Sequence, residues 1–243
     1  MEIKIKNNYD AVSETAARTI AGEILTREDP VLGLPTGDTP KGTYELLVNY
    51  YEQGLLDFSR VKSFNLDEYY PISPDHRKSF ARYMEKRLFG KVDTREKNVT
   101  VPDGTVPRDK IERYCKSYEE KISAAGGIDL LILGIGKNGH IGFNEPGTDF
   151  GSKTRLVELT ERTKKENFND PDAAPDRAIT MGIRTIMNAK RIVLLATGEE
   201  KSRSIGKALT GPVTEEWPAS ILQLHPNAAF VLDRRAGKEV RNL

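Results

Sequence analysis

Residues 131–146, LILGIGKNGHIGFNEP, join an apolar run to a glycine-rich turn. The run reads as a buried strand, and the turn then delivers Asn138, His140, Asn144 and Glu145 within eight residues. In an open parallel sheet, ligands bind outside the carboxyl ends of the strands. An imidazole and a carboxylate brought together there can transfer protons near neutral pH. The stretch therefore predicts an α/β fold with its reactive site at this turn.

The same turn matches the dinucleotide-binding pattern G-x-G-x-x-G at Gly134–Gly139, with an acid, Glu158, about 20 residues further on. That pattern requires a helix to begin at the glycines. The residues that follow, HIGFNEPGTDFGS, contain three glycines and a proline, which disfavour a helix. We therefore expect no dinucleotide here, and interpret the glycines as allowing the backbone to approach a sugar or a phosphate.

Strand and helix patterns alternate along the whole chain. Strands are expected at 1–7, 30–37, 61–70, 128–136, 191–198 and 228–234, an extended segment at 98–104, and helices at 9–28, 39–54, 79–92, 108–127 and 199–211. The continuous apolar runs at 128–136 and 191–198 are typical of strands covered on both faces. The order predicts one α/β domain over residues 1–243: a doubly wound, Rossmann-like, largely parallel sheet with helices on both faces. The polar, proline-broken residues 159–178 predict a mobile lid.

Composition excludes several classes of protein. Lys and Arg number 37 against 36 Asp and Glu, so the net charge of +1 provides no basic field for nucleic acid. No apolar stretch is long enough for a membrane span, and the first residues, MEIKIKNNYD, lack the apolar core of a signal peptide. The single cysteine, Cys115, excludes an internal disulfide framework and a Cys-rich metal site. We expect a cytoplasmic protein with no nucleic-acid or membrane partner.

A second strand end with chemistry is LPTGDTPKGT at residues 34–43. The strand runs into Thr36, Gly37, Asp38 and Thr39, and Pro40 then opens a helix. Backbone N–H groups at a helix start, together with threonine hydroxyls, suit a phosphate. The alternative is a structural turn with capping threonines.

Two further strand ends carry charge. Asp67 and Glu68 follow the apolar start of FNLDEYY, and neighbouring side chains there can point to opposite sides. One carboxylate in a crevice could act as a base, whereas the alternative is a solvated acidic turn. Lys201 follows the glycine turn of ATGEEK and could reach an anion, unless it is an ordinary surface lysine. The four ends together predict chemistry on a phosphorylated polyol. No metal site is implied, because His140 has no partner at ligand spacing.

The segments LGLPTGDTP, FNLDEYY, LGIGKNGHIGFNEPG, AITMGI, LLATGEEK and PASILQLHP occur in this order, and with them the chain resembles the glucosamine-6-phosphate deaminase family nearly end to end. Phosphogluconolactonases share the fold but usually read GPDGHTASLFP where this chain has GKNGHIGFNEP. The resemblance implies a reaction of an aminosugar 6-phosphate with water to give a ketose 6-phosphate and ammonia, without a cofactor. The partners would be this small-molecule sugar phosphate and, in a homo-oligomer, further copies of the chain.

The resemblance also implies roles for individual residues. Asp67 would be the base that moves a proton between carbons 2 and 1 of the sugar. His140 would assist opening of the sugar ring, with Asn138 and Glu145 orienting it; some relatives have Asp in the place of Asn138. The phosphate would be held by Thr36, Gly37, Asp38, Thr39 and Lys201.

Two departures from the family pattern concern the phosphate. Relatives usually carry Asn-x-Arg-Phe-Phe in the lid, and its arginine grips the phosphate, whereas this chain has the shorter text ENFND at 166–170. Arg162, Lys164 or Lys165 are the candidates to replace that arginine. Asp38 stands where relatives commonly have Gly or Ser, which would place a negative charge beside the phosphate.

These departures leave the substrate open. A galactosamine-6-phosphate deaminase/isomerase is one alternative, because that branch also tends to have an altered lid. A non-catalytic sugar-phosphate sensor of the same fold is another. Sensors that regulate transcription need a DNA-binding module, whereas this sequence starts directly on its first strand, and a sensor does not need Asp67, His140 and Glu145 together. We therefore favour an enzyme.

Overall fold

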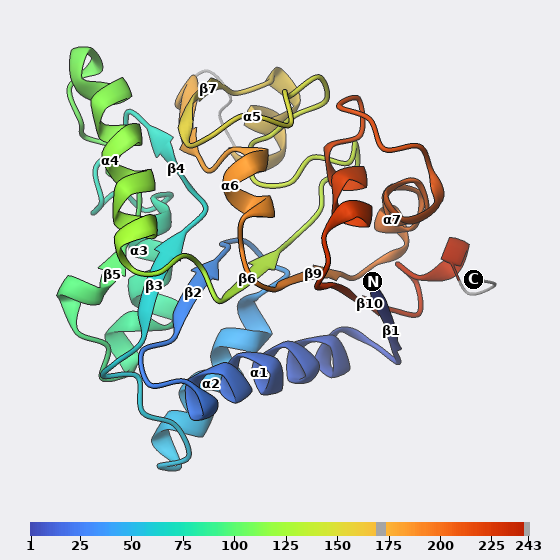
Figure 1. The fold of residues 1–243 in the computed structure, drawn as a ribbon, viewed down its shortest axis with the longest axis horizontal. Coiled ribbons are helices and arrows are strands. Elements are labelled where there is room, and N and C mark those ends of the chain that lie inside the picture. Colours follow the sequence, from blue (N-terminus) through green and yellow to red (C-terminus); the bar gives the residue numbers. More distant parts are fainter. Residues whose placement is uncertain (169–173, 241–243) are drawn as a thin grey trace.

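The computed structural model describes residues 1–168 and 174–240, which are built around a seven-stranded parallel sheet (Figure 1). Its strands are β1 (Glu2–Lys6), β2 (Val31–Leu34), β3 (Lys62–Asn65), β5 (Val99–Thr100), β6 (Leu130–Leu133), β9 (Ile192–Ala196) and β10 (Ala228–Asp233). They lie in the order β1-β10-β9-β6-β2-β3-β5. The chain runs outward from β2 to β3 and β5, then returns to β6 on the other side of β2. The direction of winding therefore reverses between β2 and β6, where such sheets bind ligands.

The predicted helices are present, with ends shifted by a few residues. The α-helices are α1 (Tyr9–Thr26), α2 (Lys41–Glu52), α3 (Phe80–Arg87), α4 (Ile111–Ala124), α5 (Glu161–Asn167), α6 (Ile183–Met187) and α7 (Ser202–Thr210). Short 3₁₀ helices are η1 (Phe89–Lys91), η2 (Glu96–Asn98), η3 (Arg108–Lys110), η5 (Glu199–Lys201), η6 (Pro218–Leu224) and η7 (Lys238–Val240). None of the helices described is both long and apolar enough to cross a bilayer.

Two hydrophobic cores lie on the two faces of the large sheet. Along β6, Leu130 and Ile132 belong to the core that contains the buried side chains of α1 and α2. Leu131 and Leu133 alternate with them and belong to the core that contains side chains of α4, α6 and α7. Figure 1 shows α1 and α2 below the sheet and α6 and α7 above it. This alternation confirms the predicted doubly wound fold, because continuous apolar strands bury both of their faces.

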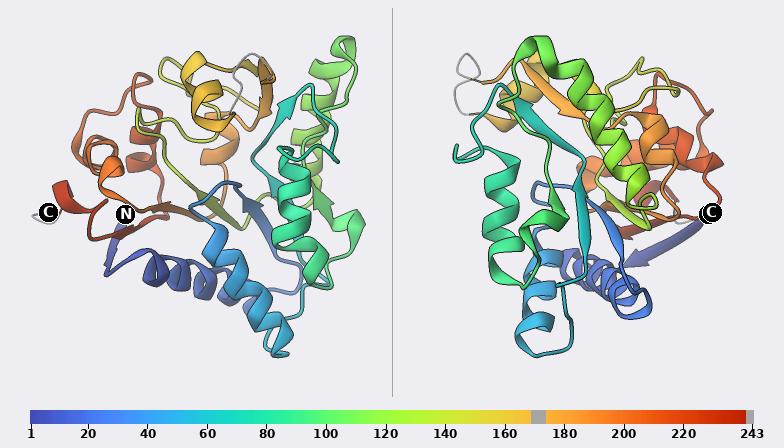
Figure 2. Two further views of the ribbon diagram at one scale, coloured as in Figure 1. Left: turned by 180° about the vertical axis from the view of Figure 1, so that it is seen from behind. Right: turned by 60° about the vertical axis from the view of Figure 1, so that its left-hand side comes forward.

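A second, three-stranded antiparallel sheet was not predicted. It contains β4 (Asp67–Tyr70), β8 (Arg177–Thr180) and β7 (Arg155–Glu158), in the order β4-β8-β7. The prediction of one strand over 61–70 is therefore wrong: the chain leaves the large sheet at Leu66, and Asp67 pairs with Thr180 instead. An apolar pattern cannot show a strand changing sheets, because both halves are buried. From two further sides, Figure 2 shows this small sheet and α5 on the opposite side of the large sheet from α1.

The segment 159–178, predicted as a loop, begins with a helix. Thr160 is the N-cap of α5, and its hydroxyl accepts a hydrogen bond from the Thr163 backbone N–H at 3.2 Å. The sequence ERTKKEN is polar on all sides, so it gave no apolar stripe by which to predict a helix. Residues 169–173 of this segment lie outside the described part of the chain. Mobility of the lid stays a prediction.

Candidate active site

Four loops meet around a cavity of about 290 Å³ at the carboxyl ends of β9, β6, β2 and β3, which are neighbours in the sheet. Six of the predicted site residues line it: Thr36, Gly37, Thr39, Asp67, His140 and Lys201. Asn138 and Glu145 lie behind His140 and are bonded to it directly or through one another. The structure therefore brings together eight of the nine predicted residues; the ninth, Asp38, is exposed and does not line the cavity.

The loop after β2 is fixed by hydrogen bonds to its backbone. Gly37 has φ of +100°, a conformation that favours glycine, and its carbonyl accepts from the Tyr83 hydroxyl at 2.6 Å. The Tyr9 hydroxyl donates to the Asp38 carbonyl at 3.0 Å and accepts from the Gly42 N–H at 2.8 Å. A loop held in this way is preorganised for an anion at the start of α2.

Lys201 reaches the cavity from the far side. It is the last residue of η5, directly before α7, and its Nζ donates to the Ile135 carbonyl at 2.8 Å. Ile135 belongs to the loop after β6, so the ammonium group is tied to the wall of the cavity. The alternative of an ordinary surface lysine is therefore wrong. Lys201 places a positive charge in the cavity that the threonine loop also lines.

Asp67 and Glu68 point to opposite sides, as adjacent strand residues do. The Glu68 carboxylate accepts hydrogen bonds from the Ser79 hydroxyl at 2.8 Å and from the backbone N–H groups of Phe80 and Ala81, each at 2.9 Å. It thereby caps α3, which starts at Phe80. Burial raises the pKa of Glu68, and these donors oppose that rise. One acid of the pair thus caps a helix and the other lines the cavity, and the alternative of a solvated acidic turn is wrong because both are buried.

Asp67 is the member of the pair that lines the cavity. Its exposed fraction is 8 %, and burial, followed by the negative charge of Glu68, raises its pKa to about 8. A carboxyl group with such a pKa exchanges protons readily near neutral pH, which suits a general base. Gly142 lies beside Asp67, and its φ of +57° favours glycine at this position.

His140, Asn138 and Glu145 form a hydrogen-bonded relay. Asn138 Nδ2 donates to Glu145 Oε2 at 2.6 Å, so its oxygen faces His140 Nδ1 at 2.7 Å. An amide oxygen can only accept, which requires the proton of a neutral imidazole to be on Nδ1 and leaves Nε2 as the atom that exchanges protons. Gly136 makes room for the ring, because a Cβ there would lie 2.2 Å from Nδ1.

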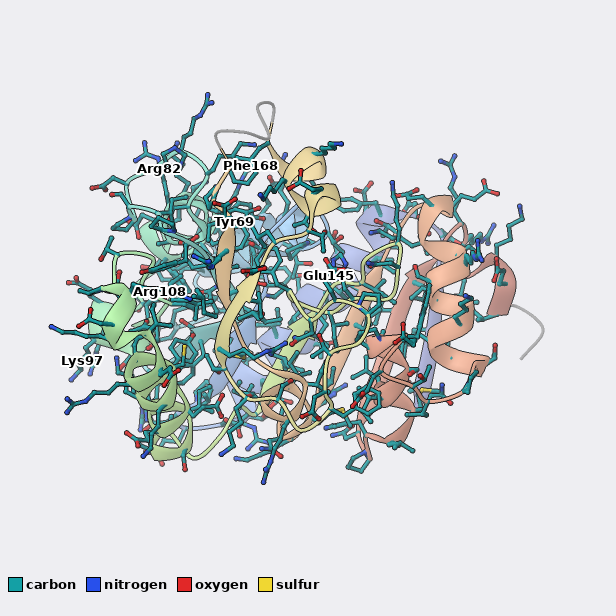
Figure 3. All side chains as sticks on the ribbon, turned by 90° about the horizontal axis from the view of Figure 1, so that it is seen from above. Tyr69, Arg82, Lys97, Arg108, Glu145 and Phe168 are labelled. Atoms are coloured by element: carbon teal, nitrogen blue, oxygen red, sulfur yellow. The ribbon has the colours of Figure 1, made fainter. Side chains whose placement is uncertain are left out.

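Sequence reasoning missed Thr163 and four aromatic residues of the site. Phe168, just after α5, lies with its ring centroid 5.0 Å from that of Tyr69, and Figure 3 shows the two together. Tyr69 also contacts Phe80 and Phe143, at 4.6 and 5.7 Å, and all three line the cavity. These residues come from β4, α3, the loop after β6 and the lid, so no local pattern connects them. Only the unpredicted small sheet brings them together.

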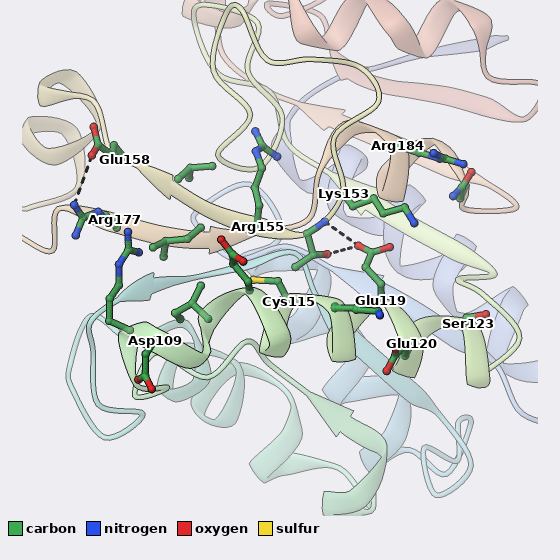
Figure 4. A pocket seen from close by; sticks show the side chains of 18 residues that line it. Asp109, Cys115, Glu119, Glu120, Ser123, Lys153, Arg155, Glu158, Arg177 and Arg184 are labelled. Carbon is green, nitrogen blue, oxygen red and sulfur yellow. Dashed lines mark hydrogen bonds and ion pairs between the residues drawn. The ribbon is translucent and has the colours of Figure 1, made fainter.

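A larger hollow of about 1140 Å³ lies elsewhere, between α4 and the strands β7 and β8 (Figure 4). Its charged side chains interact with one another: Arg177 pairs with Glu158 at 3.6 Å, and Glu119 accepts from the Thr154 N–H at 2.9 Å. It lies away from the reversal point of the sheet, and none of the predicted site residues lines it. The smaller cavity is therefore the candidate active site.

Comparison with known families shows to which family the chain belongs. The sequence model of a family described as glucosamine-6-phosphate isomerases/6-phosphogluconolactonase matches residues 5–231. The chain belongs to this family. The isomerase/lactonase family thus accounts for nearly the whole sequence, including all four loops of the site.

Individual relatives narrow the comparison. A glucosamine-6-phosphate deaminase from Clostridium acetobutylicum is 47 % identical over 241 residues, which cover 98 % of this chain and 99 % of the relative. A second, from Clostridium botulinum strain Kyoto, is 46 % identical over 243 residues, with 99 % of each chain covered. A solved structure described as a monomeric glucosamine-6-phosphate deaminase superposes with a TM-score of 0.95 at 40 % identity, over 98 % of this chain and 100 % of its own.

Proposed function

We propose that this chain is a glucosamine-6-phosphate deaminase, which converts glucosamine 6-phosphate and water into fructose 6-phosphate and ammonia. The observation that carries the proposal is the pairing, in one cavity, of the buried base Asp67 with the His140 relay, opposite a loop and lysine suited to phosphate. The names and high coverage of the clostridial relatives support the same substrate.

The phosphate would bind between the loop after β2 and Lys201. The hydroxyls of Thr36 and Thr39 supply donors, and the ammonium of Lys201 supplies charge. Asp38 is not part of this proposed set, because its side chain is exposed and does not line the cavity. In the lid, Lys164 pairs with Asp176 at 2.7 Å and Lys165 is exposed. The Arg162 side chain lies outside the described part of the structure.

His140 acts first in the proposed mechanism. A ring-closed aminosugar must open before carbon 1 becomes an aldehyde, and opening moves the proton of the carbon-1 hydroxyl to the ring oxygen. Nε2 of His140 can accept and return that proton, because Nδ1 is held by Asn138. The relay keeps the neutral imidazole in one tautomer, so Nε2 is free to accept the proton and, as imidazolium, to return it.

Asp67 acts second. Its carboxylate removes the proton from carbon 2, while the aldehyde oxygen takes a proton from a water molecule, and the product is an enol that still carries the amino group. Asp67 then returns a proton to carbon 1, which leaves a protonated imine at carbon 2. Water adds to that carbon and ammonia leaves, so the water oxygen becomes the ketone of fructose 6-phosphate. A pKa of about 8 lets one carboxyl group both take and give the proton.

The experiment that tests this function measures ammonia and ketose 6-phosphate from three substrates in parallel. Glucosamine 6-phosphate should give both products in equal amounts, and faster than galactosamine 6-phosphate does. Preference for galactosamine 6-phosphate would make the chain a galactosamine-6-phosphate deaminase/isomerase, the alternative suggested by its altered lid. Hydrolysis of 6-phosphogluconolactone without ammonia release would make it a lactonase. Binding of the sugar phosphates with no turnover would make it a sensor.

We also propose that each chain acts with its own complete site, in the cytoplasm. The solved relative at 40 % identity is described as monomeric, which supports this proposal. A homo-oligomer stays an alternative, which sedimentation of the purified protein decides. The single cysteine, Cys115, is buried, in keeping with a reducing compartment.

A further inference from the structure

The lid helix α5 begins beside the last member of the His140 relay. The Thr163 hydroxyl donates to Glu145 Oε1 at 3.1 Å. The oxygens of Thr163 and Thr160, the N-cap of α5, are 2.9 Å apart. The Glu145 carboxylate accepts this hydrogen bond, so the Thr163 hydroxyl is the donor. The Thr163 oxygen can then accept a hydrogen bond from the Thr160 hydroxyl. Hydrogen bonds therefore run without a break from the first turn of the lid helix to His140.

Glu145 uses its two oxygens for different neighbours. Oε1 accepts from Thr163 of the lid and lies 3.6 Å from His140 Nδ1, and Oε2 accepts from Asn138 of the relay. The carboxylate is thus held in one plane by a contact on each side. If the Thr163 contact is lost, the carboxylate can rotate, and Asn138 loses the acceptor that fixes which end of its amide faces His140.

The position of Thr163 makes its contact with Glu145 depend on whether α5 is docked on the cavity. Its exposed fraction is 6 %, and it lines the cavity. At the other end of α5, Phe168 packs on Tyr69, which lines the same cavity. The two ends of α5 therefore contact the cavity at separate points, and among the side chains that the structure describes in α5, Thr163 contacts the relay.

We propose that Thr163 is a positioning residue that couples docking of the lid helix to proton transfer by His140. The inference rests on the proposed deaminase function and adds a residue to its machinery. With α5 docked, Thr163 completes the set of contacts on Glu145, and Nδ1 of His140 carries the proton. With α5 withdrawn, the relay loses this anchor, and the imidazole populates both tautomers. Proton transfer is thereby confined to the state in which the lid covers the substrate.

The test compares Thr163→Val, which keeps the shape and removes the hydroxyl, with Thr163→Ser, which keeps the hydroxyl. Loss of a hydrogen bond to a charged group predicts that kcat of the Val variant falls roughly ten- to a hundred-fold. KM for glucosamine 6-phosphate should change by less than about three-fold, since the contact orients the relay and does not bind substrate. The Ser variant should recover most of kcat. A Val variant with wild-type kcat would overturn the proposal.

Asp176→Asn is the matched control within the lid. It removes the ion pair with Lys164 at 2.7 Å and touches no member of the relay. Its kcat should stay within about two-fold of wild type, because exposed ion pairs contribute little. If this variant loses as much kcat as Thr163→Val, general loosening of the lid explains both results and the proposal is wrong.

A measurement independent of turnover separates this inference from the proposed function. The chain has three histidines, His76, His140 and His225, so ¹⁵N NMR can follow the tautomer of each ring. The wild-type protein should show His140 with its proton on Nδ1, and Thr163→Val should show a mixture. An unchanged tautomer would overturn the inference even in a working deaminase. If the wild-type protein releases no ammonia, the deaminase function fails, yet the tautomer comparison still decides the role of Thr163.

Discussion

The neutral amide of Asn138 lies between Glu145 and His140: its Nδ2 is 2.6 Å from Glu145 Oε2, and its Oδ1 is 2.7 Å from His140 Nδ1. A carboxylate at this position would also fit the hydrogen bond with His140. A carboxylate in that place could accept a hydrogen bond from His140, but it could not donate a hydrogen bond to the Glu145 carboxylate. The amide does both at once, and so fixes the orientation of three side chains without adding a second negative charge. The relay in this chain is therefore built to hold the imidazole in one state.

Asn138→Leu should lower kcat, because a leucine of similar size removes both hydrogen bonds and frees the tautomer of His140. We expect kcat to fall by roughly ten-fold or more, but by no more than the 10²–10⁴-fold that the whole acid–base group contributes. Steady-state kinetics with glucosamine 6-phosphate provide the measurement. KM should be nearly unchanged, since Asn138 does not line the cavity. A variant with normal kcat would show that the relay does not orient His140.

The raised pKa of Asp67 predicts the pH dependence of the free enzyme. Asp67 must be ionised to act as a base, and its pKa is about 8. We expect kcat/KM to fall by about ten-fold for each pH unit below that value. The measurement is kcat/KM between pH 5.5 and 9, a range that spans about two units below the pKa. An acidic limb near pH 4, the ordinary range of an Asp, would contradict the buried environment assigned to this carboxyl group.

The same pKa predicts a cost in stability. An unfolded Asp67 releases its proton near its ordinary pKa of 3.8, whereas the folded state retains it up to about 8. Between these values the native state binds more protons, so wild-type stability falls as the pH rises. Asp67→Asn removes the effect, and its stability gain over wild type should grow through this window by at most about 1.4 kcal/mol per pH unit. Melting curves at pH 4, 6 and 8 measure the gain, which should be smallest at pH 4.

Much of the site could be predicted from local sequence because parallel strands gather their carboxyl ends. Thr36, Asp67, His140 and Lys201 each follow a glycine turn or a strand end, and the fold brings four such ends to one cavity. The pairing of β2 with β6 then places the reversal of winding between two of these loops. Alternating patterns and strand ends therefore carried most of the information about where the chemistry lies.

The rest depends on contacts between distant segments. The small sheet pairs β4 with β8, more than a hundred residues apart, and neither strand alternates in a way that shows a partner. The sequence predicted a lid at 159–178, but helix α5 is polar on all sides, so neither the helix nor the contact of Thr163 with Glu145 had a signal in the sequence. Asp38 shows the opposite error: its place in a promising loop suggested a ligand contact, but its side chain faces solvent.

Restoring the lid arginine should tighten phosphate binding. Lys164 is engaged with Asp176 and Glu161 in the lid, at 2.7 and 3.2 Å, so it is poorly placed to replace that arginine. Rebuilding Asn-x-Arg-Phe-Phe between Glu166 and Asp170 should lower KM for glucosamine 6-phosphate by roughly ten- to a hundred-fold, the effect of a charge-assisted contact. An analogue without phosphate should show no gain. An equal gain for both would mean that the change orders the loop, and no gain would mean that a present residue already holds the phosphate.

Release of ammonia by wild-type and Asp67→Asn protein tests the central claim most directly. Asparagine keeps the shape of the side chain but cannot take the proton from carbon 2. We predict equal amounts of ammonia and fructose 6-phosphate from the wild type, and a rate lower by roughly 10²–10⁴-fold from the variant. Substrate binding should be retained, because the residues proposed to hold the phosphate lie on the other loops. A variant that keeps more than about a tenth of wild-type turnover would contradict the assignment of Asp67 as the base.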